Sequence, residues 1–150
     1  MNKQKLQEEL KQSMLARDEL RTSVLRMLLS ALNYYEIQKG GAGYTASEED
    51  ILSVVQKEAK QRRDSIEEYK KAERQDLVDK EQKELAILET FLPEQMGEDE
   101  IRIIVEQTIT EVGATAMQDM GKVMGALNNK LKGKADMGMV SSLVRNKLTS

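Results

Sequence analysis

Two groups of side chains have the types and spacing to do chemistry, and both are built from charged residues. Cysteine and histidine are absent from the 150 residues. This excludes thiol nucleophiles, disulfides, thiolate or imidazole metal sites and histidine acid–base catalysis. The sequence also contains no Gly-x-Ser-x-Gly motif and no Walker-type phosphate loop. We therefore predict no catalytic residue, no metal site and no cofactor.

The first group lies on a predicted long helix, where Glu58 and Arg62 are four residues apart. A carboxylate and a guanidinium at this spacing can pair, and Ser65 or Tyr69 on the same arc could complete the hydrogen bonding. Apolar residues share that arc, so partial burial is expected. Two interpretations stay open, a ligand pocket and a structural network that fixes helix register. We favour the structural network, because the sequence offers no second catalytic partner.

The second group is basic and lies near the carboxyl end. Lys122 and Asn129 fall on nearly the same bearing of a predicted helix, opposite its apolar stripe, so that face is expected to be exposed. Glycines beside the lysine allow either a packed helix or a phosphate backbone to approach closely. A basic loop follows. The predicted nucleic-acid-binding residues are Gly121, Lys122, Gly125, Asn129, Lys130, Lys132, Gly133 and Lys134.

The charge distribution supports a local basic surface only. The chain has 23 basic and 26 acidic residues, a net charge of −3, so no global positive field attracts nucleic acid. Residues 96–120 carry a net charge of −5 and residues 121–150 a net charge of +5. Lysines late in a helix also complement its dipole, which is the ordinary explanation. The last third has no aromatic residue for base stacking, which favours contact with a folded RNA over single-strand recognition.

The elements that position these groups are predicted to be helices, since Lys, Glu, Gln, Leu, Met and Ala dominate the composition. A first helix around Leu6 ends near Arg17, and Asp18 caps a second that runs to the loop Gly40–Gly43. Overlapping capping boxes, Thr45 with Glu48 and Ser47 with Asp50, begin a third. The later helices are predicted at about 48–71, 76–91, 98–112, 117–131 and 136–148, with Gly113 and Gly133 at left-handed C-caps.

Pro93 ends the fourth helix, because it lacks an N–H and pushes the preceding residue out of the helical region. We therefore predict an all-α fold with a four-helix N-terminal domain, residues 1–95, and a three-helix C-terminal domain, residues 96–150. The amino-terminal residues have no apolar signal region, and no apolar run reaches membrane-spanning length. A soluble, cytoplasmic protein without a membrane partner is expected.

Read together, these segments resemble the YqeY family over nearly the whole chain. The resemblance is carried by Leu25–Leu32, Lys60–Ile66, Tyr69, Ala72, Arg74, Asp76–Leu77, Phe91–Gln95, Glu111–Ala114, Asp119–Gly125 and Lys132–Asp136. From about Met96 the chain also looks like the tail domain of the GatB subunit of tRNA-dependent amidotransferases. Two positions depart from the family pattern. Gly97 replaces a Ser or Thr N-cap, and Met137 precedes Gly138 where Asp-Gly is usual, at the start of the last helix.

The resemblance implies contact with tRNA, because the related tail grips folded tRNA while the chemistry takes place elsewhere. Carried over to this sequence, Lys122, Lys132 and Lys134 become candidate phosphate contacts, and Gly121, Gly125 and Gly133 would permit close approach. A shared fold does not by itself establish a shared function. The sequence-based hypothesis is a non-catalytic tRNA-binding module or accessory factor.

Two alternatives from other functional classes remain. The chain could be a protein-interaction adaptor for an aminoacyl-tRNA synthetase or an amidotransferase subunit, which would bind through apolar contacts that salt affects little. It could also be a carbon–nitrogen ligase with glutamine as amido donor, as the family name would suggest. Amide transfer needs an activated nucleophile and an oxyanion hole. No cysteine exists, and no lysine partner can be nominated for Ser30, Ser65, Ser141 or Ser142.

Overall fold

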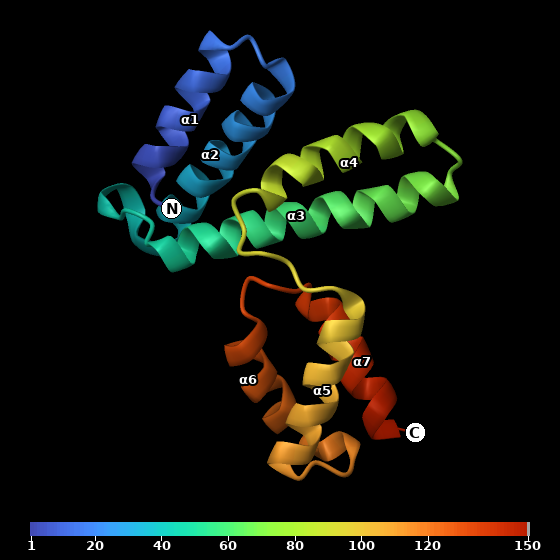
Figure 1. Cartoon of the computed structure of the whole chain (residues 1–150). Coiled ribbons are helices and arrows are strands. Elements are labelled where there is room, and N and C mark those ends of the chain that lie inside the picture. The colour runs from blue at the N-terminus through green and yellow to red at the C-terminus, as the bar shows by residue number, and fades with distance from the viewer. Residues whose placement is uncertain (150) are drawn as a thin grey trace. The chain divides into compact units, whose positions relative to one another are not determined.

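The computed structural model describes residues 1–149, and helices are the only regular elements in that part of the chain (Figure 1). The prediction of an all-α protein is confirmed. The α-helices are α1 (Lys3–Leu15), α2 (Glu19–Gly40), α3 (Glu48–Lys71), α4 (Gln75–Glu89), α5 (Glu98–Val112), α6 (Met120–Leu131) and α7 (Met137–Thr149). The chain divides into two compact units, Met1–Leu92 with α1 to α4 and Pro93–Ser150 with α5 to α7.

Local capping decides where α2 and α3 begin. The Asp18 carboxylate accepts the N–H of Arg21 at 3.0 Å, as predicted. Of the two overlapping capping boxes, α3 uses the second: Ser47 Oγ accepts the Asp50 N–H and Asp50 Oδ2 accepts the Ser47 N–H. The glycine run differs slightly from the predicted loop, because Gly40 still closes α2 and only Gly41–Gly43 form a short 3₁₀ turn.

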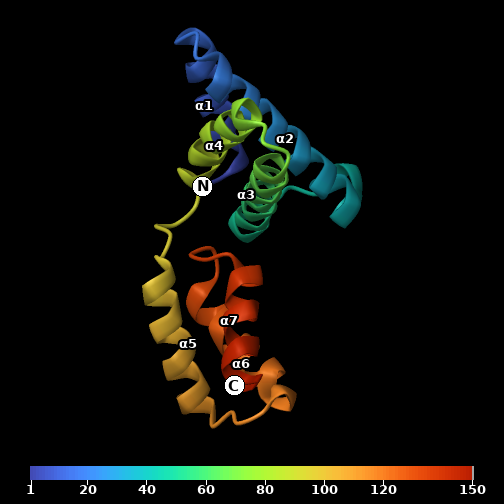
Figure 2. The same cartoon turned by 90° about the vertical axis from the view of Figure 1, so that its right-hand side faces the viewer.

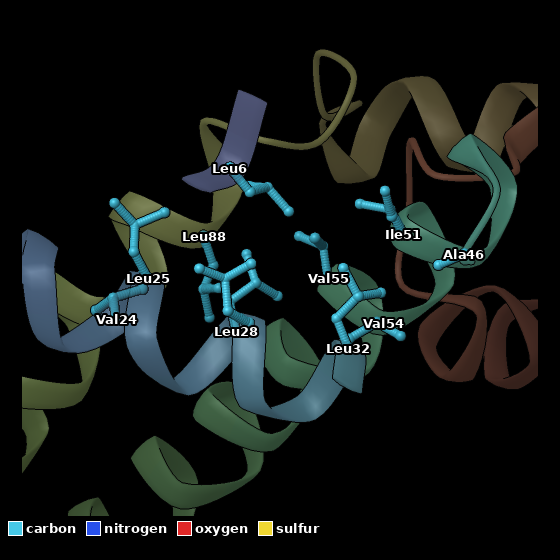
Figure 3. Packing of buried hydrophobic residues seen from close by; sticks show 11 residues of the cluster. Leu6, Val24, Leu25, Leu28, Leu32, Ala46, Ile51, Val54, Val55 and Leu88 are labelled. Atoms are coloured by element: carbon cyan, nitrogen blue, oxygen red, sulfur yellow. The ribbon is translucent and has the colours of Figure 1, made fainter. Parts of the chain in front are cut away.

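The first unit is held by an apolar core between α1, α2, α3 and α4 (Figure 3). Large side chains with almost no exposure fill its centre: Leu6, Leu25, Leu28, Leu32, Ile51, Val55 and Leu88. Each such side chain stabilises the fold by about 1.5–3 kcal/mol relative to an exposed one. Helices α3 and α4 form an antiparallel pair (Figure 1), which brings polar groups of α4 beside those of α3.

The second unit packs α5, α6 and α7 around a separate core (Figure 2). The buried apolar residues are Ile101, Val105, Val123, Leu127, Leu131, Val140 and Val144. The helix predicted from residue 117 starts three residues later, because Met117–Asp119 form a 3₁₀ turn in which Asp119 accepts the N–H groups of Thr115 and Ala116. Gly113 takes the predicted left-handed cap, with φ of 68°.

Two positions that depart from the family pattern still form ordinary helix starts. Gly97 precedes α5 with an extended backbone, and its carbonyl accepts the first helical N–H, from Ile101. Asp136 Oδ1 accepts the N–H of Gly138 at 2.9 Å, and α7 begins at Met137. Among residues 1–149, no helix has both the length and the apolar character needed to cross a lipid bilayer.

Candidate nucleic-acid interface

Helix α6 separates its residues into a buried and an exposed face. Val123, Leu127 and Leu131 are fully buried against α5 and α7. On the opposite face Lys122, Gly125 and Asn129 are exposed. At 3.6 residues per turn these three fall within about 60° of one another around the helix axis. Lys122 and Asn129 therefore lie on the same solvent-exposed face of α6, as predicted, and Gly125 lies on that face too.

The exposed face of α6 is bare at its two glycines. A Cβ built on Gly121 or Gly125 would meet no atom within 4 Å. The sequence suggested that these glycines allow either a neighbouring helix or a phosphate backbone to approach closely. No segment of residues 1–149 packs against them. A glycine inside a helix costs about 1 kcal/mol relative to alanine. Helix α6 thus carries two destabilising residues that serve no contact within the described chain.

The loop after α6 is held in place by its own backbone. Gly133 is buried with φ of 78°, Gln95 Nε2 donates to its carbonyl at 2.7 Å, and Met96 N–H donates to the carbonyl of Lys134 at 2.9 Å. Gly133 therefore serves a left-handed turn, and it does not offer the open approach expected from the resemblance. The side chains of Lys132 and Lys134 lie exposed on either side of it.

Lys130 differs from the other predicted lysines because its ammonium group is occupied. Its Nζ donates to Thr108 Oγ1 at 3.1 Å and to Glu111 Oε2 at 2.7 Å, both on α5. Lys147 of α7 likewise pairs with Glu106 at 2.7 Å. The acidic and basic halves of this unit therefore neutralise each other in part. Sequence reasoning missed this because 19 residues separate Lys130 from its carboxylate.

Lys122 and Lys134 are exposed, as the sequence predicted. Among residues 1–149, no carboxylate oxygen lies within 4.0 Å of either ammonium group. The nearby Asp119 carboxyl has a lowered pKa, chiefly because it accepts two backbone N–H groups, with Lys122 adding a smaller effect. We call the exposed lysines Lys122, Lys132 and Lys134 the basic row. Lys132 lies ten positions after Lys122, so the 1.5 Å rise per helical residue places these two residues about 15 Å apart along α6.

The predicted polar group on α3 is real but has different members. Arg62 is buried and its NH1 donates to Glu58 Oε2 at 3.1 Å. Ser65 and Tyr69 form no hydrogen bond with this pair in the described chain. The further partners come from α4, where Glu84 and Glu81 approach Arg62 Nε at 3.2 and 3.8 Å. The partners differ from the prediction because α4 packs closely on α3. Helix periodicity does not reveal that packing.

A second buried carboxylate site was not predicted. Asp50 was expected only as a capping residue, yet it also accepts hydrogen bonds from Tyr35 at 2.8 Å, from Lys39 at 2.7 Å and from Tyr44. The bond from Lys39 is the largest cause of the strongly lowered pKa of the Asp50 carboxyl. In the sequence, the capping box already accounts for Asp50. No spacing pattern indicates that Tyr35, Lys39 and Tyr44 gather around it.

The fold and the candidate site define an all-helical protein with exposed lysines on α6 and on the loop that follows it. The chain belongs to the family of YqeY-like proteins, whose family model matches residues 3–148. The resemblance to that family is therefore confirmed.

Curated relatives carry the name altered inheritance of mitochondria protein 41, mitochondrial. The relative from Vanderwaltozyma polyspora is 30% identical over 95% of this chain and 79% of its own length. The relative from Lachancea thermotolerans is 36% identical over 71% of this chain and 57% of its own length. The one from Saccharomyces cerevisiae strain S288c is 30% identical over 83% of this chain and 69% of its own length.

Proposed function

We propose that this protein binds folded RNA of the tRNA type, without catalysis, through the exposed face of α6 and the loop Lys132–Lys134. In this proposal the four-helix part, residues 1–95, and the three-helix part, residues 96–150, act as separate domains. The observation that carries the proposal is the open glycine face beside Lys122, an ammonium group with no carboxylate within 4.0 Å in the described chain.

Three physical features support phosphate contact at this face. The Lys122 ammonium is a mobile point charge that suits phosphates independently of base sequence. Gly121 and Gly125 let a sugar–phosphate backbone come close to the helix, since no side chain covers it there. Lys132 and Lys134 extend the basic row to the far end of α6 on a loop whose backbone is anchored by Gln95 and Met96.

The first test reverses three charges at the predicted contacts. The variant Lys122→Glu, Lys132→Glu, Lys134→Glu is expected to weaken binding to unmodified tRNA at least about tenfold. The slope of log affinity against log salt concentration should fall by about 2 to 3. A matched control reverses three exposed lysines of the first unit, Lys5, Lys11 and Lys57, with the same change in net charge. Filter binding or anisotropy at several salt concentrations measures both variants.

The outcome separates the candidate functions. Equal loss in both triple variants, or equal retention of duplex DNA and tRNA by the parent, would reduce the basic row to general surface charge. Binding of an aminoacyl-tRNA synthetase or amidotransferase subunit that salt does not weaken, without tRNA binding, would instead support the adaptor alternative. Far-UV circular dichroism of each variant checks that the helices remain folded.

The second test uses the two open glycines. The variant Gly121→Ala, Gly125→Ala is expected to stabilise the second unit by about 1–2 kcal/mol, because alanine is the better helix former and nothing blocks either methyl group. The same two methyl groups are expected to weaken tRNA binding severalfold by holding the RNA backbone away. A more stable protein with unchanged affinity would show that the RNA does not contact this face.

A further inference from the structure

In the first unit, α2, α3 and α4 line a cavity of about 600 Å³ that is open to solvent. Its apolar wall comes from Leu20 and Met27 of α2. Its polar wall comes from Arg62 of α3 and from Glu81 and Glu84 of α4. The cavity is built from residues of the first unit, and the proposed RNA contact uses residues of the second unit.

The polar wall carries an excess of negative charge. Carboxylates of Glu58, Glu81 and Glu84 all lie within 4 Å of the Arg62 guanidinium, so two negative charges are in excess when all four groups are ionised. Glu19 and Lys80 also line the cavity, and their opposite charges leave that excess unchanged. Buried charges are stable only when they are paired and hydrogen-bonded. A second cation beside Arg62 would therefore stabilise the ionised cluster.

The hydrogen bonding of the cluster is incomplete in the same place. The Glu84 side chain is only 9% exposed, and its Oε2 lies 3.2 Å from Arg62 Nε as an ion pair without a hydrogen bond in residues 1–149. Glu81 Oε2 and Arg62 Nε are buried atoms without a hydrogen-bond partner in the described chain. Buried carboxylate oxygens are nearly always hydrogen-bonded. Glu81 Oε2 is therefore a buried acceptor without a donor in the described chain, and Glu84 beside it is held by the ion pair with Arg62.

The surroundings distinguish an organic cation from a metal ion. Among residues 1–149, no group of three or more acidic side chains is arranged to hold a metal ion. An ammonium group brings three N–H donors and one positive charge. The methylene chain of an aliphatic amine matches the wall formed by Leu20 and Met27. Glu19, on the same cavity, offers a carboxylate for a second ammonium group.

We propose that this cavity binds a short aliphatic diamine or polyamine. One ammonium group donates to the carboxylates of Glu81 and Glu84, and the alkyl chain lies against Leu20 and Met27. Binding requires ionised glutamates, so affinity falls at acid pH. The groups that face the ammonium site are Glu19 of α2, Glu58 and Arg62 of α3, and Lys80, Glu81 and Glu84 of α4.

Calorimetric titration of the full chain with putrescine, at low ionic strength and without RNA, tests the proposal. One site per chain is expected, and Glu84→Gln is expected to weaken binding about tenfold or more, because a charged acceptor becomes neutral. The matched control is Glu68→Gln, an exposed carboxylate on α3, which should leave affinity unchanged. Methyl resonances of Leu20 and Met27 should shift on addition of putrescine.

Two results would overturn the amine site. Equal affinity of the parent and Glu84→Gln would place putrescine on general surface charge, and magnesium chloride that binds the same site more tightly than putrescine would make it a metal site. If Glu84→Gln fails to fold, Glu81→Gln and the Leu20 and Met27 resonances decide the question, and unmoved resonances contradict the proposal. The tRNA proposal is tested on residues of α6 and its loop, so either proposal can fail without the other.

Discussion

Asp50 and Glu84 are buried to nearly the same degree, with side-chain exposures of 7% and 9%, but their hydrogen bonding is opposite. Asp50 accepts from Tyr35, Lys39, Tyr44 and the backbone of Ser47. Glu84 forms no hydrogen bond in residues 1–149, and its charged neighbour is the Arg62 Nε at 3.2 Å. Burial alone therefore does not separate a carboxylate that holds the fold from one that is available to a ligand. The hydrogen bonds that the carboxylate accepts separate the two.

The pKa directions of the two sites agree with this difference. Asp50 has a strongly lowered pKa, because Lys39 and Tyr44 donate to its ionised form. Glu81, beside Glu84, has a raised pKa, because burial and the charge of Glu84 both disfavour ionisation. Ionised Asp50 therefore stabilises the folded state. Ionised Glu81 destabilises it.

Removing the Asp50 charge is expected to cause the largest effect. In Asp50→Asn, an amide meets donors that need an acceptor, and Tm is expected to fall by roughly 10 °C at pH 7. The lowered pKa sets the sign of the pH dependence. The advantage of the parent is complete above the unfolded pKa of 3.8 and declines as pH falls below it. Thermal melts at pH 7 and pH 2.5 measure it. A constant difference would contradict a role for the charge.

A methyl group at Gly40 tests the same site from its edge. A Cβ there would lie 2.6 Å from the Cβ of Tyr44, which donates to Asp50. Gly40→Ala is therefore expected to destabilise the first unit by about 1–3 kcal/mol, by displacing Tyr44. Gly43→Ala is the matched control, because its Cβ would meet no atom within 4 Å. Equal urea midpoints for the two variants would show that Tyr44 moves without cost.

Neutralising Glu81 is expected to give the smallest effect, and in the opposite direction. Glu81→Gln should raise Tm by a few degrees at pH 7. It removes a carboxylate whose ionised form is disfavoured by burial and by the charge of Glu84, as its raised pKa reflects. The parent should lose stability as pH rises above the unfolded value of 4.5, and the gain of the variant should grow over that interval. A lower Tm at neutral pH would mean that ionised Glu81 supports the fold, and the contrast with Asp50 would fail.

The helices were predictable because their signals are local. Ser47 with Asp50, Asp18 and Pro93 mark helix ends by chemistry that acts within four residues. The apolar spacing of Val123 and Leu127 placed the inner face of α6 correctly for the same reason. The start of α6 was predicted three residues early, because Asp119 prefers to cap the turn of Thr115 and Ala116, a choice that periodicity does not record.

The candidate site was predictable only in part. The exposure of Lys122 and Asn129 followed from helix geometry, and the pair Glu58–Arg62 followed from its spacing of four residues. The capture of Lys130 by Glu111 did not follow, and neither did the approach of Glu81 and Glu84 to Arg62. Those contacts join different helices, and their partners are set by how the helices pack.

The amino-acid sequence by itself determined an all-helical chain, the main helix limits and which faces turn inward, because capping and periodicity depend on neighbours a few residues away. Tertiary structure alone decided which charges are neutralised. It joined Lys130 to α5, surrounded Asp50 with hydrogen-bond donors and placed Glu84 against Arg62 without a hydrogen bond. The energy of a charge depends on every group within a few ångströms, and those groups come from helices distant in the chain.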